Sequence, residues 1–511
     1  MSERTTIADG LATQARNQPR VATLTFVMVV AQLAITVPLA YVLNVWQDDA
    51  YTLASTAGSL RHAIHQAIFF EQNAPLYFAL MVLWRAVSSS YFVARLFSVL
   101  CAAGVVYVLP KLLQRYLPDV QPAWIMLAVA FNPFLIWAAL EIRLYALVIL
   151  LSTLLLLTFY DAFLIRRPSR GHQLAYAALC IISAYTQYYL LALIVAQGLV
   201  LVLRRRWRAL GTYVAIGVVA MLAFVPMLRV LPAQLANFRG SFVAPHTPLV
   251  PATTLAEILL QYVVPLTVIP HHKALYAALI IAALAGGFAA RRYAGAKTNL
   301  LIGLMLAPAF VLFSLVIFAA GEHILNRHAA SLFVPTVMTA FAALTIFREP
   351  ARGRAVAAVG LLILASSAVT LVSTYRPMAK AGDWTRLTSY LEARERPGQP
   401  ILVFEAENAV PLAYYYRGPN PIVAIPVAVD FRTYNVDRFV LHDGAQIAAQ
   451  LARIPGDHRT LWLVTGQYCR ALNIDFGCDT LERYVRDHYE TLSAARFYGS
   501  ELRELRRVTH Q

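Results

Sequence analysis

Long apolar runs recur along most of this chain, and they constrain its fold more than any other feature. Runs long enough to cross the hydrocarbon core of a bilayer extend from about residue 21 to about residue 375. Of 511 residues, 59% are hydrophobic and 14% are charged, which is far too apolar for a soluble domain. The sequence therefore predicts a polytopic α-helical membrane protein. Residues 1–20 lack a signal-peptide cleavage pattern, so we expect a retained first span.

The positive charge of the chain is concentrated in short loops between these runs. Lysine and arginine gather at residues 111–115, 166–170, 204–208, 291–297 and 348–354. The positive-inside rule places these loops and the N-terminal segment 1–20 in the cytoplasm. The formal charge of +16 forms no basic stripe on a soluble segment, so we set a nucleic-acid partner aside.

Counting spans under this rule predicts about eleven crossings of a bacterial inner membrane. A single run is expected at residues 121–139. The run 173–203 has basic loops at both ends, so we divide it at residues 185–187 into two short helices. The stretch 74–87 is one crossing too many, and we expect it to lie in the outer interface, within an outer loop at 44–91. The transmembrane domain is then residues 21–376, with a cytoplasmic N-terminus.

After residue 376 the composition becomes polar, charged and rich in proline and glycine. Residues 377–511 match one small domain, which the span count places in the periplasm. The segments 387–395 and 481–489 are typical of helices, while 400–404 and 460–464 are typical of buried strands. A small α/β domain is expected. Cys469 and Cys478 can pair there in an oxidising compartment, or remain two free thiols.

Carboxylates gather on the predicted outer face of the transmembrane domain. Six of the nine acidic residues between positions 21 and 375 lie on it, including Asp48, Asp49, Glu71 and Glu141. Charged groups at a membrane boundary are costly and usually functional. The positive-inside rule barely constrains carboxylates, so this excess needs another cause. It indicates a functional site.

Three motifs in this region resemble those of the GT-C superfamily of polyprenyl-phosphate-sugar-dependent glycosyltransferases. Gln47-Asp48-Asp49-Ala50-Tyr51 resembles the acidic motif in the first outer loop of the protein O-mannosyltransferase and lipid A aminoarabinose transferase branch. The segments 71–77 and 132–145 resemble its Pro-Pro-Leu-Tyr segment and its entry to the second outer loop. Asp49 replaces a commoner glutamate, and Asn73-Ala74-Pro75 replaces a basic or histidine residue and the first proline.

The resemblance implies an inverting glycosyltransferase that takes a sugar from an undecaprenyl-phosphate-type donor. The acceptor would be a glycan, a lipid or a protein on the periplasmic side. Asp48 would be the general base, with Asp49 in support. The leaving phosphate needs positive charge, and the candidates are Arg143 and the pair Arg327 and His328.

Glu71 and Glu141 are candidates for binding the substrate or a divalent cation. Carboxylates alone suit Mg or Mn, and an added His323 or His328 would suit Zn. Spacing alone establishes no metal site. Each of the candidate residues also has a structural alternative, such as a hydrated loop, a helix cap or a local ion pair.

Two other functions remain open at this point. A transporter or flippase of lipid-linked sugars would place ionisable residues near the bilayer midplane, often between internal repeats. A non-catalytic envelope scaffold would use the outer domain to recruit a partner. The acidic residues lie at the ends of the predicted helices and no internal repeat is found, which favours the enzyme.

Overall fold

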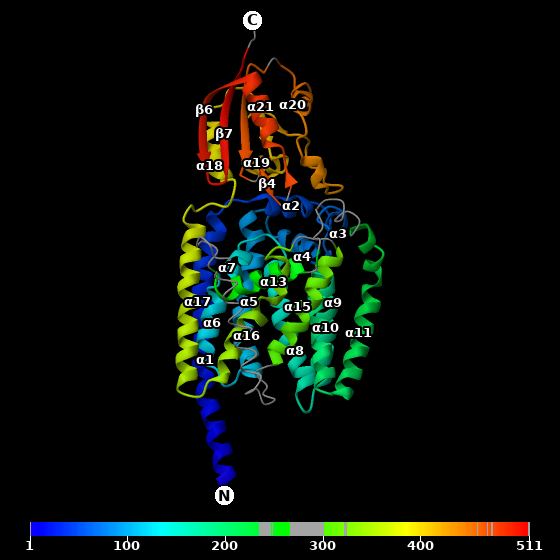
Figure 1. The fold of residues 1–511 in the computed structure, drawn as a ribbon, viewed down its shortest axis with the longest axis vertical. Helices are drawn as coiled ribbons and strands as arrows, with labels where there is room; N and C mark the ends of the chain where they lie inside the picture. Colours follow the sequence, from blue (N-terminus) through cyan, green and yellow to red (C-terminus); the bar gives the residue numbers. More distant parts are fainter. Residues whose placement is uncertain are drawn as a thin grey trace.

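The structure is a computed structural model that describes residues 2–234, 247, 249–265, 301–320, 324–456, 458–467, 469–471 and 474–508. A helical bundle forms most of the molecule, and a small α/β domain lies against one end of it (Figure 1). The N-terminus extends from the opposite end of the bundle (Figure 1). The last long helix ends at Tyr375, and all the described strands follow it.

Within the described residues, six stretches are long and apolar enough to cross a membrane. They belong to α1 (Ser2–Val42), α5 (Tyr91–Tyr116), α8 (Tyr145–Phe159) with its π-helical extension η1 (Tyr160–Leu164), α11 (Trp207–Leu228), α15 (Leu301–Ala320) and α17 (Ala351–Tyr375). A bent pair, α6 (Pro122–Ala130) and α7 (Pro133–Ala139), would make a seventh. The predicted span 272–290 lies outside the described residues. The count of about eleven crossings therefore stays a prediction, as does their orientation.

The run 121–139, which the sequence predicted as one crossing, consists of two helices. Its two halves meet at an angle of 50°. Oδ1 of Asn132 accepts a hydrogen bond from the backbone N–H of Phe134 at 3.0 Å, and Pro133 occupies the first position of α7. An asparagine cap followed by proline starts a new helix, because proline cannot donate to the preceding turn. The chain then reaches Glu141 through a short loop instead of a continuous span.

Shorter helices complete the bundle. They are α2 (Gln47–Ser55), α3 (Leu60–Phe69), α4 (Leu76–Arg85), α9 (Arg170–Thr186), α10 (Leu190–Leu203), α13 (Leu249–Val263), η3 (His328–Leu332), α16 (Phe333–Ala343) and η4 (Leu344–Ile346). The break between α9 and α10 lies where the sequence predicted two short helices. α2 and α3 lie at the end of the bundle that faces the α/β domain (Figure 1).

The α/β domain contains a five-stranded sheet in the order β2-β1-β3-β7-β6. Its strands are β1 (Ile401–Phe404), β2 (Ile422–Ala424), β3 (Thr460–Gly466), β6 (Tyr489–Phe497) and β7 (Ser500–Arg507). β1 is parallel to both β2 and β3, and β7 is antiparallel to β3 and β6. The remaining elements are α18 (Trp384–Glu392), η5 (Ala406–Asn408), α19 (Ala409–Tyr415), η6 (Val436–Phe439), α20 (Gly444–Leu451), a two-stranded pair β4 (Arg470–Ala471) and β5 (Ile474–Asp475), and α21 (Cys478–His488).

Side chains of β1 alternate between two apolar cores, as the two faces of a strand require. Ile401 and Val403 pack with Trp384 of α18, while Leu402 and Phe404 pack with Ile447 of α20 and its neighbours. Both faces of β1 are therefore covered. This burial explains why residues 400–404 form a continuous apolar run.

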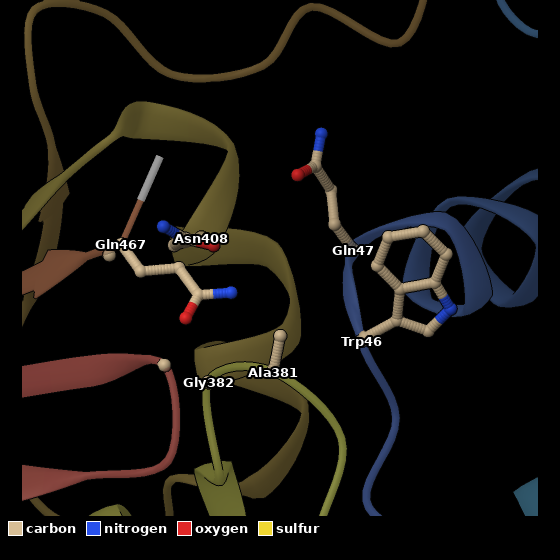
Figure 2. A pocket seen from close by; sticks show the side chains of 8 residues that line it. Trp46, Gln47, Ala381, Gly382, Asn408 and Gln467 are labelled. Atoms are coloured by element: carbon tan, nitrogen blue, oxygen red, sulfur yellow. The ribbon is translucent and has the colours of Figure 1, made fainter. Parts of the chain in front are cut away.

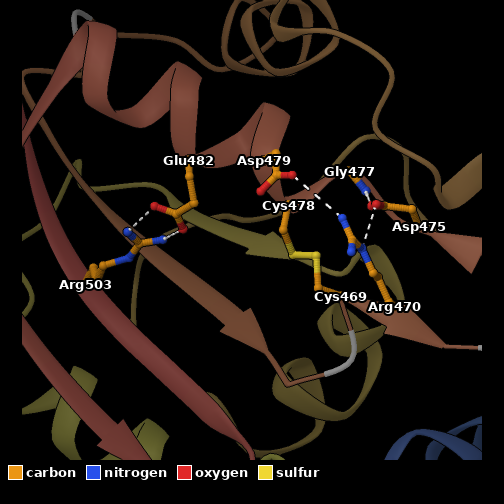
Figure 3. Close-up of a disulfide and its surroundings, with 8 residues drawn as sticks. All are labelled: Cys469, Arg470, Asp475, Gly477, Cys478, Asp479, Glu482 and Arg503. Atoms are coloured by element: carbon orange, nitrogen blue, oxygen red, sulfur yellow. Dashed lines mark hydrogen bonds and ion pairs between the residues drawn. A yellow bond between two sulfur atoms is a disulfide. The ribbon is translucent and has the colours of Figure 1, made fainter.

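A disulfide joins Cys469 to Cys478, at the start of α21, with a Cα–Cα distance of 5.8 Å (Figure 3). Between the two cysteines, Nε of Arg470 donates to Asp475 at 2.9 Å (Figure 3). The disulfide closes a short loop that contains β4 and β5, and this exposed ion pair lies within it. Cys101 and Cys180 are free and buried in the helical bundle.

Candidate active site

Asp48 and Asp49 lie in the first turn of α2, where the positive end of the helix dipole stabilises carboxylates. Consecutive residues of a helix point about 100° apart, so the two side chains meet different neighbours. Asp49 is fully buried and Asp48 is 8% exposed. The two carboxylates that were predicted as a pair are therefore two separate centres.

Asp49 is enclosed by hydrogen-bond donors. Its Oδ2 lies 3.0 Å from Nη2 of Arg95 and 2.7 Å from Nζ of Lys380. Its Oδ1 accepts from the backbone N–H of Ile142 at 2.7 Å. Burial opposes the charge of Asp49, but Lys380 and Arg95 overcome it and lower the pKa of this carboxyl. Asp49 thus links α2 to α5 and to the segment after α17.

Arg95 lies in the second turn of α5 and is completely buried. Beyond Asp49, its guanidinium donates to the backbone carbonyls of Ala40 and Leu43, both at 2.8 Å, and of Asn44 at 3.2 Å. These carbonyls lie at the end of α1, where helix carbonyls lack partners within the helix. Arg95 therefore ties α1, α2 and α5 together around the site.

Lys380 follows the last long helix, α17, and enters the site from the start of the α/β domain. Its Nζ contacts Asp49, the backbone carbonyl of Leu140 at 2.8 Å and Oε1 of Glu141 at 2.9 Å. The other oxygen of Glu141 accepts from the indole N–H of Trp46. Burial raises the pKa of Glu141 to about 7, although Lys380 and Trp46 favour its ionised form.

Glu71 and Arg143 form a buried ion pair next to Asp48. Nη1 of Arg143 donates to Oε2 of Glu71 and to the hydroxyl of Thr52, the latter at 3.0 Å. Ser55 donates to the other oxygen of Glu71 at 3.0 Å. Burial raises the pKa of Glu71, and Arg143 opposes that effect. Nη2 of Arg143 lies 3.5 Å from Oδ1 of Asp48.

Arg327 reaches Asp48 from the other side. Its Nη1 donates to Oδ2 of Asp48 at 2.6 Å, across 279 positions of sequence. The side chain of Arg327 is 26% exposed, more than that of any other cation in the site. Asp48 therefore lies between two guanidinium groups, and the one from Arg327 is open to approach. The neighbouring His328 has its ring 5.8 Å from that of Tyr189, at the rim of this region.

The structure brings together Asp48, Asp49, Glu71, Glu141, Arg143 and Arg327, which the sequence predicted as one site. It also adds residues that the sequence analysis missed: Arg95, Lys380, Tyr51 and Glu407. A lone arginine inside an apolar run was a usable signal for Arg95, because such charges are costly. No local signal marked Glu407 or Lys380, since each reaches the site from beyond the last span.

Glu407 is a fifth buried acid, contributed by η5 of the α/β domain. Its Oε1 accepts from the hydroxyl of Tyr51 in α2 at 2.6 Å. Burial raises the pKa of Glu407 to about 7, against the hydrogen bonds from Tyr51 and Tyr434. The backbone N–H of Val45 donates to the hydroxyl of Tyr415 at 2.6 Å, which adds a second link between the domain and the bundle.

The described residues contain no group of three or more His, Cys, Asp or Glu side chains arranged to hold a metal ion. The two acids predicted as metal candidates are each paired with a cation, Glu71 with Arg143 and Glu141 with Lys380. An arriving ion would have to displace these cations. His323, a possible zinc ligand, lies outside the described residues.

We compared the sequence and the structure of this chain with those of known proteins. No family model matches the sequence, and no curated protein matches it either. Two solved structures of ArnT from Cupriavidus metallidurans match almost the whole chain. The structure bound to undecaprenyl phosphate covers 93% of this chain and 97% of its own, with 15% identity and a TM-score of 0.57. The apo structure covers 95% and 98%, with 14% identity and a TM-score of 0.57.

At this identity, the likeness establishes the fold. The chain has the fold of these ArnT structures, which is the fold that the resemblance of its motifs implied. The match extends over both parts of the chain, so the α/β domain is part of the shared architecture. It is a multi-pass membrane fold.

Proposed function

We propose that this chain is a glycosyltransferase of the bacterial inner membrane. It transfers a sugar from an undecaprenyl-phosphate-type donor to an acceptor on the periplasmic face. The observation that carries the proposal is the position of Asp48 between Arg143 and Arg327, at one end of an ArnT-like bundle. One of the matching ArnT structures holds undecaprenyl phosphate, which supports a donor of this class.

Asp48 is a better candidate for the general base than Asp49. Asp49 has no exposed surface, and two cations and a backbone N–H occupy its oxygens. A base must come within hydrogen-bond reach of the hydroxyl that it deprotonates. Asp48 keeps a small exposed surface and contacts cations that can turn to another anion. Asp49 then holds α2 in position for it.

The two guanidinium groups are suited to the phosphate of the donor. Arginine pairs with phosphate through charged, directional hydrogen bonds. In the structure Arg327 and Arg143 are neutralised partly by Asp48. Donor phosphate arriving beside them would compete for these donors and leave the Asp48 carboxylate available to the acceptor.

The proposed transfer is a single displacement. The acceptor hydroxyl oxygen forms a bond to the anomeric carbon of the sugar while its proton passes to Asp48. The bond between that carbon and the phosphate oxygen breaks, and the phosphate leaves with the electron pair. Arg143 and Arg327 stabilise the charge that develops on the leaving group. No step is assigned to a divalent cation, since Glu71 and Glu141 are held by basic side chains.

The test replaces Asp48→Asn in the full chain, with Asp161→Asn as the matched control. Asp161 is also paired with an arginine, Arg115, at 2.8 Å, but belongs to η1 and lies away from the site. Mass spectrometry of envelope glycans and glycoproteins, compared with cells lacking the protein, reports transfer. Native mass spectrometry of the purified protein reports retained undecaprenyl phosphate.

We expect Asp48→Asn to abolish the protein-dependent glycan while undecaprenyl phosphate is still retained, and Asp161→Asn to preserve both. Loss of a general base typically slows a reaction by about 10²–10⁴-fold. Normal glycan in the Asp48→Asn strain would remove Asp48 from the mechanism. A wild-type protein that moves lipid-linked sugar across vesicles without any glycosyl product would instead identify a transporter.

A further inference from the structure

The α/β domain contributes a carboxyl group that contacts the helix carrying Asp48. Glu407 belongs to η5, which connects the end of β1 to α19, and α19 packs against α2. Asn408, the next residue, and Gln47 of α2 line the same small pocket between the domain and the bundle (Figure 2). Glu407 therefore lies where the two parts of the chain meet.

The carboxyl of Glu407 contacts α2 on both sides of the proposed base. Tyr51 donates its hydroxyl hydrogen to Oε1 of Glu407 at 2.6 Å, and Gln47 donates a second hydrogen bond to this carboxyl. Gln47 and Tyr51 are four positions apart, so they lie one turn from each other on the same face of α2. Asp48 lies between them in the sequence and is a neighbour of Tyr51 on the helix surface. One side chain of the α/β domain thus holds the turn of α2 that carries Asp48.

The ring of Tyr51 has little freedom to move away from Glu407. Tyr51 is 4% exposed, and its ring meets that of Phe70 edge-on with the centroids 5.2 Å apart. From the α/β domain, the rings of Phe431 and Tyr434 meet it edge-on at 6.2 and 6.4 Å. Edge-to-face contacts at these distances are favourable. The α/β domain therefore contacts this turn of α2 through one carboxyl and two rings.

The surroundings of Glu407 contain hydrogen-bond donors and no paired cation. The titratable groups that face its carboxyl are Tyr51 and Asp48 of α2, and Tyr434 of the segment before η6, which donates a third hydrogen bond. The strands that pack against η5, β1 and β2, carry no titratable side chain. The two tyrosines that end α19, Tyr414 and Tyr415, contact the ring of Tyr91 in α5. Among the described residues no cation forms an ion pair with Glu407, so its charge depends on these three donors.

We infer that Glu407 is a positioning residue for Asp48, on which it acts through Gln47 and Tyr51. It acts on α2 and not on the reacting atoms. The inference rests on the proposed function, because it concerns the placement of the base in that reaction. Misplacement of a catalytic group by about 1 Å can slow a reaction about 10²-fold, so the residue that holds this turn influences the rate of transfer.

Protonation of Glu407 changes the strength of this hold. Burial raises the pKa of Glu407 to about 7, although its three hydrogen-bond donors favour the ionised form. The ionised carboxylate accepts from all three donors, and charge-assisted hydrogen bonds are roughly twice as strong as neutral ones. Below a pH of about 7 the carboxyl keeps its proton and these bonds are weaker. Transfer should therefore become faster as pH rises through this value.

The test measures the protein-dependent glycan of the envelope by mass spectrometry at about pH 6 and about pH 8, on either side of the pKa of Glu407. Outer-membrane porins give the periplasm the pH of the medium. The variants are Glu407→Gln, Tyr51→Phe and the two combined. Glu395→Gln is the matched control, because Glu395 also accepts from a tyrosine hydroxyl, that of Tyr416 at 2.6 Å, but both belong to the α/β domain. Each value is divided by the amount of folded protein from fluorescence-detected size-exclusion chromatography.

We expect Glu407→Gln to match the wild type at the lower pH and to form about tenfold less glycan at the higher one, which is the difference between charged and neutral hydrogen bonds. Its amide stays neutral where the carboxyl ionises. Tyr51→Phe should lose a similar factor at the higher pH. The double variant should lose less than the product of the two single losses, because both changes act on one hydrogen bond. Glu395→Gln should follow the wild type at both pH values.

A purely structural role for Glu407 would lower the glycan by the same factor at both pH values, and that result would overturn the inference. Fully independent losses in the double variant would do the same. The Kd for undecaprenyl phosphate, from native mass spectrometry, is a second readout. We expect it to be unchanged in Glu407→Gln, because the described contacts of Glu407 include neither Arg143 nor Arg327. An increase of about tenfold would instead place Glu407 at the donor.

The two proposals fail separately. If the proposed function is wrong, Asp48→Asn will leave the glycan unchanged at both pH values. If only the positioning role is wrong, Asp48→Asn will abolish the glycan, while Glu407→Gln and Tyr51→Phe will keep the wild-type ratio between the two pH values.

Discussion

Nζ of Lys380 lies 2.7 Å from Oδ2 of Asp49, although 331 positions of sequence separate the two residues. Lys380 stands just after the last long helix and Asp49 just after the first. This ion pair therefore links the segment after the first long helix to the segment after the last one, where the α/β domain begins. Glu141 shares the same ammonium group, so removing one side chain would leave two buried carboxylates with one cation fewer.

Lys380→Met should destabilise the protein strongly. Breaking a buried ion pair from one side typically costs about 3–5 kcal/mol, because the remaining charge is left without a partner. We expect a clear fall in the apparent melting temperature of the detergent-solubilised protein. Lys111→Met is the control, since Lys111 contacts only the ring of Tyr107 among the described contacts and lies on α5 away from the site. Equal melting temperatures for the two variants would contradict this account of Asp49.

Arg95→Lys should not restore the function of Arg95. The guanidinium serves three backbone carbonyls and Asp49 at once, which requires the planar fork of arginine. A lysine keeps the charge but has fewer donors and a different geometry. We expect Arg95→Lys to lower the melting temperature, and Arg95→Met to reduce the yield of folded protein further. Fluorescence-detected size-exclusion chromatography measures both; wild-type profiles for Arg95→Lys would be inconsistent with the proposed role.

Arg327→Gln should weaken donor binding more than it weakens the fold. Arg327 is partly exposed and contacts the site through Asp48, so its loss leaves no fully enclosed charge. A charged hydrogen bond to phosphate contributes about 1.5–3 kcal/mol, which corresponds to at least a tenfold increase in the Kd for undecaprenyl phosphate. Arg376→Gln, an exposed arginine just after α17, is the control. Binding is measured by native mass spectrometry titration, and an unchanged Kd would remove Arg327 from the phosphate site.

Glu407→Gln should flatten the dependence of stability on pH. Burial raises the pKa of Glu407 from 4.5 to about 7, so between these values the folded chain retains a proton that the unfolded chain releases. The contribution of Glu407 to the free energy of unfolding therefore falls as pH rises from about 4.5 to 7, by at most about 1.4 kcal/mol per pH unit. Thermal unfolding from pH 5 to 7.5 should show a smaller slope for Glu407→Gln than for wild type. An identical slope would indicate that Glu407 is ionised throughout.

Replacing both Cys469 and Cys478 with serine should destabilise the α/β domain alone. The disulfide spans nine positions, and the chain-entropy model assigns a loop of this length about 2.5 kcal/mol. Limited proteolysis should become faster within the α/β domain, while the helical bundle remains protected. Cys101→Ala provides the control because Cys101 is free and buried in α5. Unchanged proteolysis would mean that the domain does not depend on this bond.

Local patterns in the sequence predicted much of the architecture. Residues 400–404 and 460–464 were predicted as strands and form β1 and the first part of β3. The break between α9 and α10 was also predicted. The run 121–139 was predicted as one crossing and consists of two helices at an angle of 50°, because hydropathy is insensitive to a cap and a proline that start a new helix inside an apolar run. The Asn132-Pro133 dipeptide carried that information.

The sequence predicted the acids of the site, but it did not predict all of the cations that pair with them. Asp48, Glu71 and Glu141 were found because acids are rare in apolar segments and share one predicted face. Their partners Arg95 and Lys380 come from other segments, and no local spacing encodes which cation meets which acid. Nor could sequence distinguish Asp48, which keeps a small exposed surface, from the enclosed Asp49, since that difference arises from the packing of α5 and the segment after α17 around α2.

The contact between Lys380 and Asp49 also orders the events of biosynthesis. Asp49 and Glu141 emerge from the ribosome long before the residue that neutralises both of them. Until residue 380 has been made and delivered to the same side of the membrane, Asp49 has Arg95 as its cation, and Glu141 lacks the ammonium group that it contacts in the structure. The finished arrangement of α2 thus becomes stable only after the final long helix has inserted, so a chain that stops short of that point cannot assemble the site.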